Sequence, residues 1–163
     1  DRFLSGAHGF TLLELSVGLV ILSAIVSLAV PIITQATREA RSTTVVNDLR
    51  LFSAALQTYA RERGDWPAGT SEPGVFPPEM EGYPARQLGA PHTLGGFYTW
   101  SPNTLQQGQR YRAAIAIASV GADKISSDRA QFVDLDRKLD DGILETGQLR
   151  LGFRNNPFYV LEP

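Results

Sequence analysis

The chain has 163 residues, with 15 Lys and Arg against 17 Asp and Glu, for a net charge of −2. This balance predicts no broad basic face and therefore no bulk nucleic-acid binding. The absence of cysteine excludes disulfides, thiolate metal sites and a cysteine nucleophile. The two histidines, His8 and His92, are far apart in sequence, which argues against a histidine-based metal or catalytic cluster.

A run of 20 residues without charge, LSVGLVILSAIVSLAVPIIT, covers residues 15–34. A helix of this length spans about 30 Å, the thickness of the hydrocarbon core of a bilayer. A cleaved signal peptide usually has a shorter apolar region of about 7–15 residues, and a buried core helix is the other alternative. Length and composition favour a helix that spans a membrane.

One acidic side chain, Glu14, stands at the start of this run. A carboxylate inside a bilayer costs about 2.5–3.5 kcal/mol on insertion scales, and such a group generally has a partner. The other interpretation places Glu14 at the level of the lipid headgroups, where the cost is lower. The position of Glu14 alone leaves both interpretations open.

The segment Gly9-Phe10-Thr11-Leu12-Leu13-Glu14-Leu15, together with the charge-free run, resembles the processing site of type IV pilins and type II secretion pseudopilins. The resemblance covers about the first 30 residues. It implies that a prepilin peptidase cleaves between Gly9 and Phe10 and that the new amino group of Phe10 is N-methylated. It also implies that Glu14 pairs with this amine on a neighbouring subunit. A buried charge needs such a counter-charge, since removing one partner of a buried pair costs roughly 3–5 kcal/mol.

Pro31 falls inside the apolar run, where proline removes a backbone hydrogen bond and predicts a kink. By the resemblance, the helix can melt locally here in a filament. The flanking cations are Arg2 on one side and Arg38 and Arg41 on the other, and counting them favours the opposite membrane orientation. We give the processing motif precedence, because the leader, residues 1–9, looks incomplete.

A helical stripe of apolar residues follows the charge-free run, at spacings of three and four. It consists of Val45, Leu49, Phe52, Leu56 and Tyr59. We expect one helix over residues 10–63, with a membrane or filament-core half (10–36) and an amphipathic half (37–63). Two helices separated by a break at Pro31 are the alternative. The sequence Gly64-Asp65-Trp66-Pro67 predicts the helix end.

Residues 64–163 are expected to form a globular head. Its first part, residues 65–95, is rich in proline and predicts an ordered loop with a short helical turn around Pro78–Tyr83. We interpret this loop as an interaction surface. Four of its side chains are expected to pack on the core: Phe76, Met80, Tyr83 and Leu88.

Strand patterns cover residues 96–100, 111–118, 148–153 and 158–161. In the third of these, Leu149, Leu151 and Phe153 should face inward. A short helix capped by Ser127 should carry Phe132, Leu135 and Leu139 on its buried face. These elements predict an α+β fold, in which a long N-terminal helix packs on a small antiparallel sheet.

The head offers few candidates for chemistry. An acidic stretch over residues 134–142 could attract calcium, which some pseudopilins bind in a C-terminal loop. Its spacing does not match an EF-hand, so we expect a solvated helix end and an Asp-Gly turn instead. We predict no metal site and no cofactor. The four aromatic residues Trp66, Tyr98, Trp100 and Tyr111 favour core packing over ligand stacking.

The sequence therefore predicts a structural filament subunit rather than an enzyme. Expected partners are other pilin or pseudopilin subunits, the prepilin peptidase, an inner-membrane assembly platform and membrane lipid. The expected location is the inner membrane, crossed once, with the head in the periplasm or outside. A minor pilin acting as tip adhesin or initiator is the alternative, and a membrane-tethered hydrolase is a third, for which no catalytic set or G-x-S-x-G motif is found. The sequence does not choose between a secretion pseudopilus, a type IV pilus and a DNA-uptake pilus.

Overall fold

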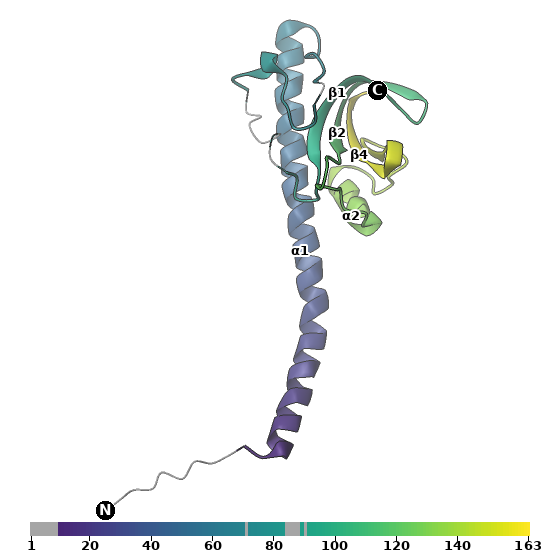
Figure 1. Ribbon diagram of the computed structural model, residues 1–163. Helices are drawn as coiled ribbons and strands as arrows, with labels where there is room; N and C mark the ends of the chain where they lie inside the picture. The colour runs from purple at the N-terminus through teal and green to yellow at the C-terminus, as the bar shows by residue number, and fades with distance from the viewer. Residues whose placement is uncertain (1–9, 71, 84–88, 90) are drawn as a thin grey trace, which may run out of the picture. The chain divides into compact units, whose positions relative to one another are not determined.

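The computed structural model describes residues 10–70, 72–83, 89 and 91–163. The predicted leader with Gly9, and Leu88, lie outside these residues. The chain divides into two compact units, Asp1–Arg38 and Glu39–Pro163, and each is considered by itself. Helix α1 (Leu12–Arg63) belongs to both units, and the second unit contains every other element (Figure 1).

Helix α1 is continuous through Pro31, so the alternative of two helices with a break there is wrong. The predicted kink stays a prediction. The helix ends at Arg63, and Gly64 adopts a left-handed backbone conformation (φ 81°) with its N–H bonded to the Ala60 carbonyl at 2.8 Å. Glycine takes this conformation at little cost, which explains why the helix stops at the predicted residue.

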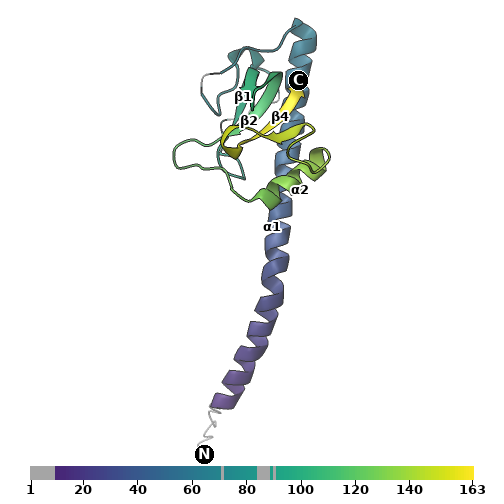
Figure 2. The same cartoon turned by 90° about the vertical axis from the view of Figure 1, so that its right-hand side faces the viewer.

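The sheet has four antiparallel strands in the order β1-β2-β4-β3. Their bounds are β1 Phe97–Gln106, β2 Gln109–Ala118, β3 Leu149–Leu151 and β4 Pro157–Glu162. Figure 2 shows β1, β2 and β4 next to one another, in front of the second half of α1. The predicted strands 111–118 and 158–161 are confirmed within these bounds.

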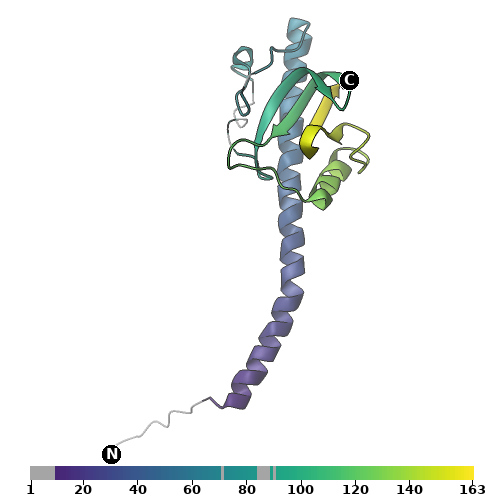
Figure 3. The same ribbon diagram turned by 45° about the vertical axis from the view of Figure 1, so that its right-hand side comes forward.

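The first strand is longer than the predicted residues 96–100, because it forms a tight hairpin with β2 (Figure 3). Gln106 pairs with Gln109, so the connection is only Gln107-Gly108, and both of these residues have positive φ. This is the backbone of a type I′ turn, which Asn-Gly and Asp-Gly signal most strongly. Gln-Gly is a weaker signal, and the second half of β1 was therefore missed.

The core lies between one face of the sheet and the second half of α1. The predicted stripe is confirmed, since Val45, Leu49, Phe52 and Leu56 are buried and Tyr59 packs partly buried against them. From the sheet, the aromatic residues Tyr98 and Trp100 and several aliphatic residues fill the same cluster. Trp100 also donates a hydrogen bond from Nε1 to the Pro67 carbonyl at 3.0 Å, which satisfies its buried polar atom.

A second, smaller cluster covers the opposite face of the sheet. It contains Tyr111, Ala114, Phe158 and Val160, and the rings of Tyr111 and Phe158 meet edge to face at 5.3 Å. Core packing of Tyr98, Trp100 and Tyr111 was the predicted role of these aromatic residues, and their burial confirms it. Both faces of the central strand β2 are thus covered by side chains.

Helix α2 (Arg129–Leu139) closes one end of the core with Phe132 and Leu135. The predicted cap, Ser127, is wrong by one residue. Asp128 caps the helix instead, because its Oδ1 accepts the Ala130 N–H at 3.1 Å. Aspartate ranks with serine as an N-cap, so the sequence pattern could not separate these neighbours.

The proline-rich loop contains the short 3-10 helix η1 (Pro78–Met80), which lies inside the predicted turn. Met80 is buried, and Phe76 and Tyr83 pack partly buried on the core, as predicted. The loop enters β1 through Gly95-Gly96. A Cβ at Gly96 would lie 2.5 Å from the Ala118 carbonyl oxygen, so only glycine fits here.

Candidate assembly site

Helix α1 begins with a reciprocal capping arrangement. The Glu14 N–H donates to the Thr11 hydroxyl at 3.2 Å, while the Thr11 N–H and hydroxyl both donate to Glu14 Oε2, at 2.9 and 2.8 Å. This is a capping box, in which two side chains satisfy backbone donors that the first turn leaves free. Glu14 thus has a partner within its own chain.

Thr11 is the residue that sequence reasoning missed at this site. The pattern Thr11-Leu12-Leu13-Glu14 is the T-x-x-E signature of a capping box. This spacing predicts a local partner for Glu14 in addition to the contact between subunits. Phe10, which precedes the cap, is 80% exposed. Its predicted cleavage partner, Gly9, lies outside the described residues.

The first unit leaves its apolar side chains uncovered on every side of the helix. From Leu12 to Ile33 each large hydrophobic residue is at least 50% exposed, and Leu12 reaches 88%. A helix that is apolar all round is stable when lipid or other helices surround it. By length and composition α1 is the one helix in the described part of the chain that could cross a membrane.

The hydroxyl side chains in the helical part of this unit are satisfied within the helix. Each serine or threonine hydroxyl between residues 16 and 37 donates to a carbonyl three or four residues earlier, at 2.7–2.9 Å: Ser16, Ser23, Ser27, Thr34 and Thr37. In lipid no water is present to satisfy such groups. The segment is therefore suited to an apolar surrounding even where its residues are polar.

The acidic stretch of the head brings three carboxylates together. Asp136, Asp140 and Asp141 each offer an oxygen, and these oxygens lie within 4.8 Å of one another. Asp136 is fully buried, and this burial, with the charges of Asp141 and Asp140, raises its pKa to about 6.

The outer two carboxylates already hold the loop that follows α2. Asp140 accepts the Gln148 N–H, and Asp141 accepts the Ile143 N–H at 2.8 Å and the Thr146 hydroxyl at 2.9 Å. Calcium takes six to eight oxygen ligands, and this cluster supplies three side chains. The arrangement suits a loop clamp, and the absence of a calcium site stays a prediction.

His92, which a hydrolase would have to use, is buried against the core. Its Nδ1 accepts the Leu94 N–H at 3.0 Å, and its ring meets the Tyr98 ring edge to face at 4.5 Å. Burial lowers the pKa of His92 to about 4. A neutral ring held in this way braces the loop before β1 and offers little to a substrate.

Comparison with solved structures supports the fold described above. No family model and no curated protein matches the chain. Among solved structures, the major type IV pilin PilA1 from Clostridium difficile matches with a TM-score of 0.55 at 14% identity, covering 77% of this chain and 97% of that chain. The chain has a pilin-like α+β fold. This fold is the one predicted from sequence.

Proposed function

We propose that this protein is a subunit of a type IV pilus-like or type II secretion pseudopilus filament, assembled through its N-terminal helix. The observation that carries the proposal is a charge-free helical segment, exposed on every side, with one carboxylate in its first turn. The pilin-like fold supports it. Packing between copies of the helix would bury the side chains that a single chain leaves uncovered.

In this proposal residues 1–9 are a leader, which the prepilin peptidase removes between Gly9 and Phe10, and Phe10 is then N-methylated. Residues 10–36 form the membrane and filament-core half of the helix, residues 37–63 its amphipathic half and residues 64–163 the head. Before assembly the chain crosses the inner membrane once and its head lies on the outer side. An assembly platform in that membrane receives it.

The capping box gives Glu14 two roles that follow one another. In a single chain the carboxylate accepts two hydrogen bonds from Thr11. These bonds offset part of the free-energy cost of placing the charge next to lipid. In the filament, the Phe10 amine of a neighbouring subunit would supply a full positive charge instead. Pro31 would let the helix loosen during packing, because the Ser27 carbonyl lacks its usual N–H partner there.

Two substitutions separate capping from charge pairing. Glu14→Gln keeps a capping-box side chain but removes the charge, so we expect filament yield to fall at least about tenfold, the size of a 1.4 kcal/mol loss. Thr11→Ala keeps the charge and removes the hydroxyl, and a smaller decrease is expected. Both variants should insert in the membrane and leave the melting temperature of the head unchanged. Normal filaments from Glu14→Gln would contradict the proposed pairing.

Processing has its own test. Mass spectrometry of the mature chain should find an N-terminus at methylated Phe10. A mature chain that retains residues 1–9 and is recovered outside the membrane fraction would overturn the proposed function.

A further inference from the structure

Two adjoining hollows lie on the head beside β3 and the start of α2. One has a volume of about 240 Å³ and the other of about 490 Å³, and both are lined by Arg129, Leu151 and Asn155. Four cations line the pair: Lys124, Arg129, Arg150 and Arg154. We call this surface the basic groove. Its only acidic lining residue, within the part of the chain that is described, is Glu145.

The basic groove carries positive charge that the head does not neutralise. Arg129 is paired with Glu145 at 2.8 Å. Arg150 is half-buried, and its guanidinium donates to the Gly147 carbonyl at 2.7 Å and to the Tyr111 hydroxyl at 3.0 Å, which are both neutral. Among the described residues no carboxylate lies within ion-pair distance of Arg150, Arg154 or Lys124.

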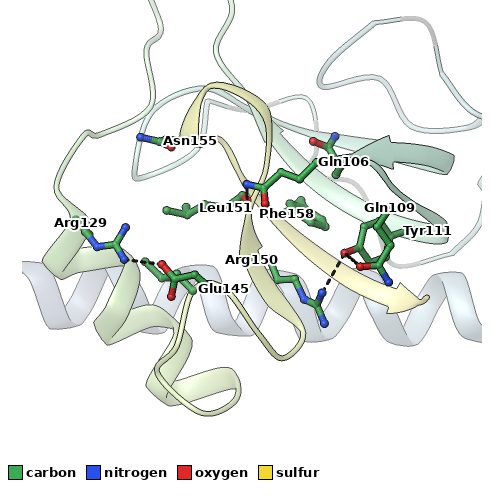
Figure 4. A pocket seen from close by; sticks show the side chains of 11 residues that line it. Gln106, Gln109, Tyr111, Arg129, Glu145, Arg150, Leu151, Asn155 and Phe158 are labelled. Carbon is green, nitrogen blue, oxygen red and sulfur yellow. Dashed lines mark hydrogen bonds and ion pairs between the residues drawn. The ribbon is translucent and has the colours of Figure 1, made fainter.

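Figure 4 shows the smaller of the two hollows that make up the groove. Arg129 and Glu145 lie on one side, Arg150 with Tyr111 on the other, and Leu151 and Phe158 between them. Cationic and amide side chains beside a few apolar ones suit a ligand that carries acidic groups together with some apolar surface.

The turn η2 (Phe153–Asn155) at the edge of the groove is strained. Arg154 and Asn155 both have φ of 58°, a region that non-glycine residues rarely occupy. The turn exposes 71% of Phe153 and places the Arg154 guanidinium 5.3 Å from the centre of its ring. Strain of this kind persists at binding and functional sites more often than elsewhere.

A surface of opposite charge lies elsewhere on the same head. Residues 64–70 and 72–83, the acidic segment, contain Asp65, Glu72, Glu79 and Glu81 and no Lys or Arg. Asp65 lies 3.8 Å from Arg112, and Glu79 accepts hydrogen bonds from the Tyr59 hydroxyl and the Ala68 N–H, so Glu72 and Glu81 carry the proposed contact. Glu72 and Glu81 are exposed, and the apolar Val75 between them is 45% exposed. Figures 1 and 3 show the η1 end of this segment on one side of α1 and the yellow β4 and η2 region on the other. A single head therefore cannot close these two surfaces on each other.

We propose that the basic groove of one copy binds the acidic segment of the next copy. This inference rests on the proposed function and adds a contact between heads to the contact between helices. Because two different surfaces meet, the contact is heterologous, and a heterologous contact that does not close a ring propagates as a helical filament. Complementary charge would fix the register between heads, while Phe153 and Val75 supply apolar area.

Cysteine cross-linking tests the contact directly, because the natural chain has no cysteine. In the full chain within filaments, Glu72→Cys combined with Arg154→Cys should give a ladder of covalent multimers under mild oxidation. Either substitution alone should give no ladder, since one thiol per chain joins at most two chains. Thr58→Cys combined with Arg154→Cys is the matched control, because Thr58 is exposed but lies outside the acidic segment. A control ladder as strong as the test ladder would overturn the proposal.

Charge exchange supplies the second test. Glu72→Lys with Glu81→Lys, and separately Lys124→Glu with Arg154→Glu, should each lower filament yield several-fold with an unchanged melting temperature of the head. The four substitutions together should recover most of that yield. Wild-type chains that form no filaments would refute the proposed function itself. Normal filaments from every variant would refute only the contact between heads, and loss of a different bound protein from the groove variant alone would assign the groove to that protein.

Discussion

The two units of this chain treat apolar side chains in opposite ways. In the first unit Leu12 and Leu28 of α1 are 88% and 71% exposed, whereas in the second unit Val45 and Leu49 of the same helix are at most 1% exposed. The backbone is helical throughout. The difference lies in the surrounding that each composition requires: an all-apolar surface needs lipid or neighbouring helices, and a striped one needs a sheet. The proposed assembly and the folding of the head thus depend on different stretches of one element.

The largest expected effect is a loss of folding stability in the second unit alone. Phe52 is 1% exposed and its ring meets Tyr98 edge to face at 5.0 Å. Phe52→Ala should destabilise the head by about 3–5 kcal/mol, because a large buried side chain leaves a cavity. Leu22→Ala, in the first unit, is the matched change and should leave thermal unfolding of the head unaltered. Equal destabilisation by both would show that the units do not fold independently.

The next largest effect is a change in the stability of the second unit at low pH. Burial lowers the pKa of His92 from 6.5 to about 4, so between these values the unfolded chain binds a proton that the folded head does not. The stability that His92 contributes to the head is therefore complete above about pH 6.5 and falls by up to about 3 kcal/mol as the pH drops to 4, at 1.36 kcal/mol per pKa unit. Asp136 acts in the opposite direction between about pH 6 and 4, because its raised pKa makes the folded head bind a proton that the unfolded chain does not.

His92→Asn checks this assignment, because an amide oxygen can still accept the Leu94 N–H but does not titrate in this range. Denaturant unfolding between pH 4 and 7 should show that the stability of the variant relative to the wild type increases as the pH falls. An identical slope for both proteins would assign the acid sensitivity to other groups.

A smaller effect is expected at the strained turn. Arg154→Gly should stabilise the head by about 0.5–1 kcal/mol, because glycine adopts a positive φ without steric cost. Arg154→Ala removes the same charge but keeps the strain and should bring no such gain. Chemical denaturation of the two variants measures the difference. A destabilised glycine variant would mean that the Arg154 side chain, rather than the backbone, dominates locally.

The smallest effect concerns the loop clamp. If Asp136, Asp140 and Asp141 bind no calcium, chelator and added calcium should leave the melting temperature the same within about 1 °C. Tight binding at a hundred times the dissociation constant would add about 2.7 kcal/mol, a shift of several degrees. A rise of this size would show that the three carboxylates form a calcium site rather than a clamp on the loop.

The sequence predicts best where a pattern is long and local. The charge-free run and the stripe from Val45 to Leu56 repeat over many turns, so the helix and its buried face follow from them. The fold class was predicted from the same patterns and four strand signals. The first turn of α1 was missed although Thr11 and Glu14 have the spacing of a capping box, because a second interpretation of Glu14 was preferred.

Sequence patterns predict the structure poorly where it depends on segments that are far apart in the chain. Phe153 continues the alternation of Leu149 and Leu151 and should face inward, yet it is 71% exposed. The strand ends at Leu151 and Phe153 begins the 3-10 helix η2, so the alternation of the strand no longer applies to it. The basic groove could not be predicted either, since its cations come from separate segments between residues 124 and 154 and the whole-chain charge of −2 conceals them.

The amphipathic half of α1 also forms one side of the core of the head. Lys138 at the end of α2 reaches back to it, with Nζ donating to the Glu39 carbonyl at 3.2 Å and to the Thr43 hydroxyl at 2.9 Å. A protease that cuts the chain before Glu39 would release a soluble fragment in which the amphipathic half of α1 still covers the sheet. A cut after Thr43 would remove both residues that accept hydrogen bonds from Lys138. The position of the cut therefore determines whether the released fragment stays folded.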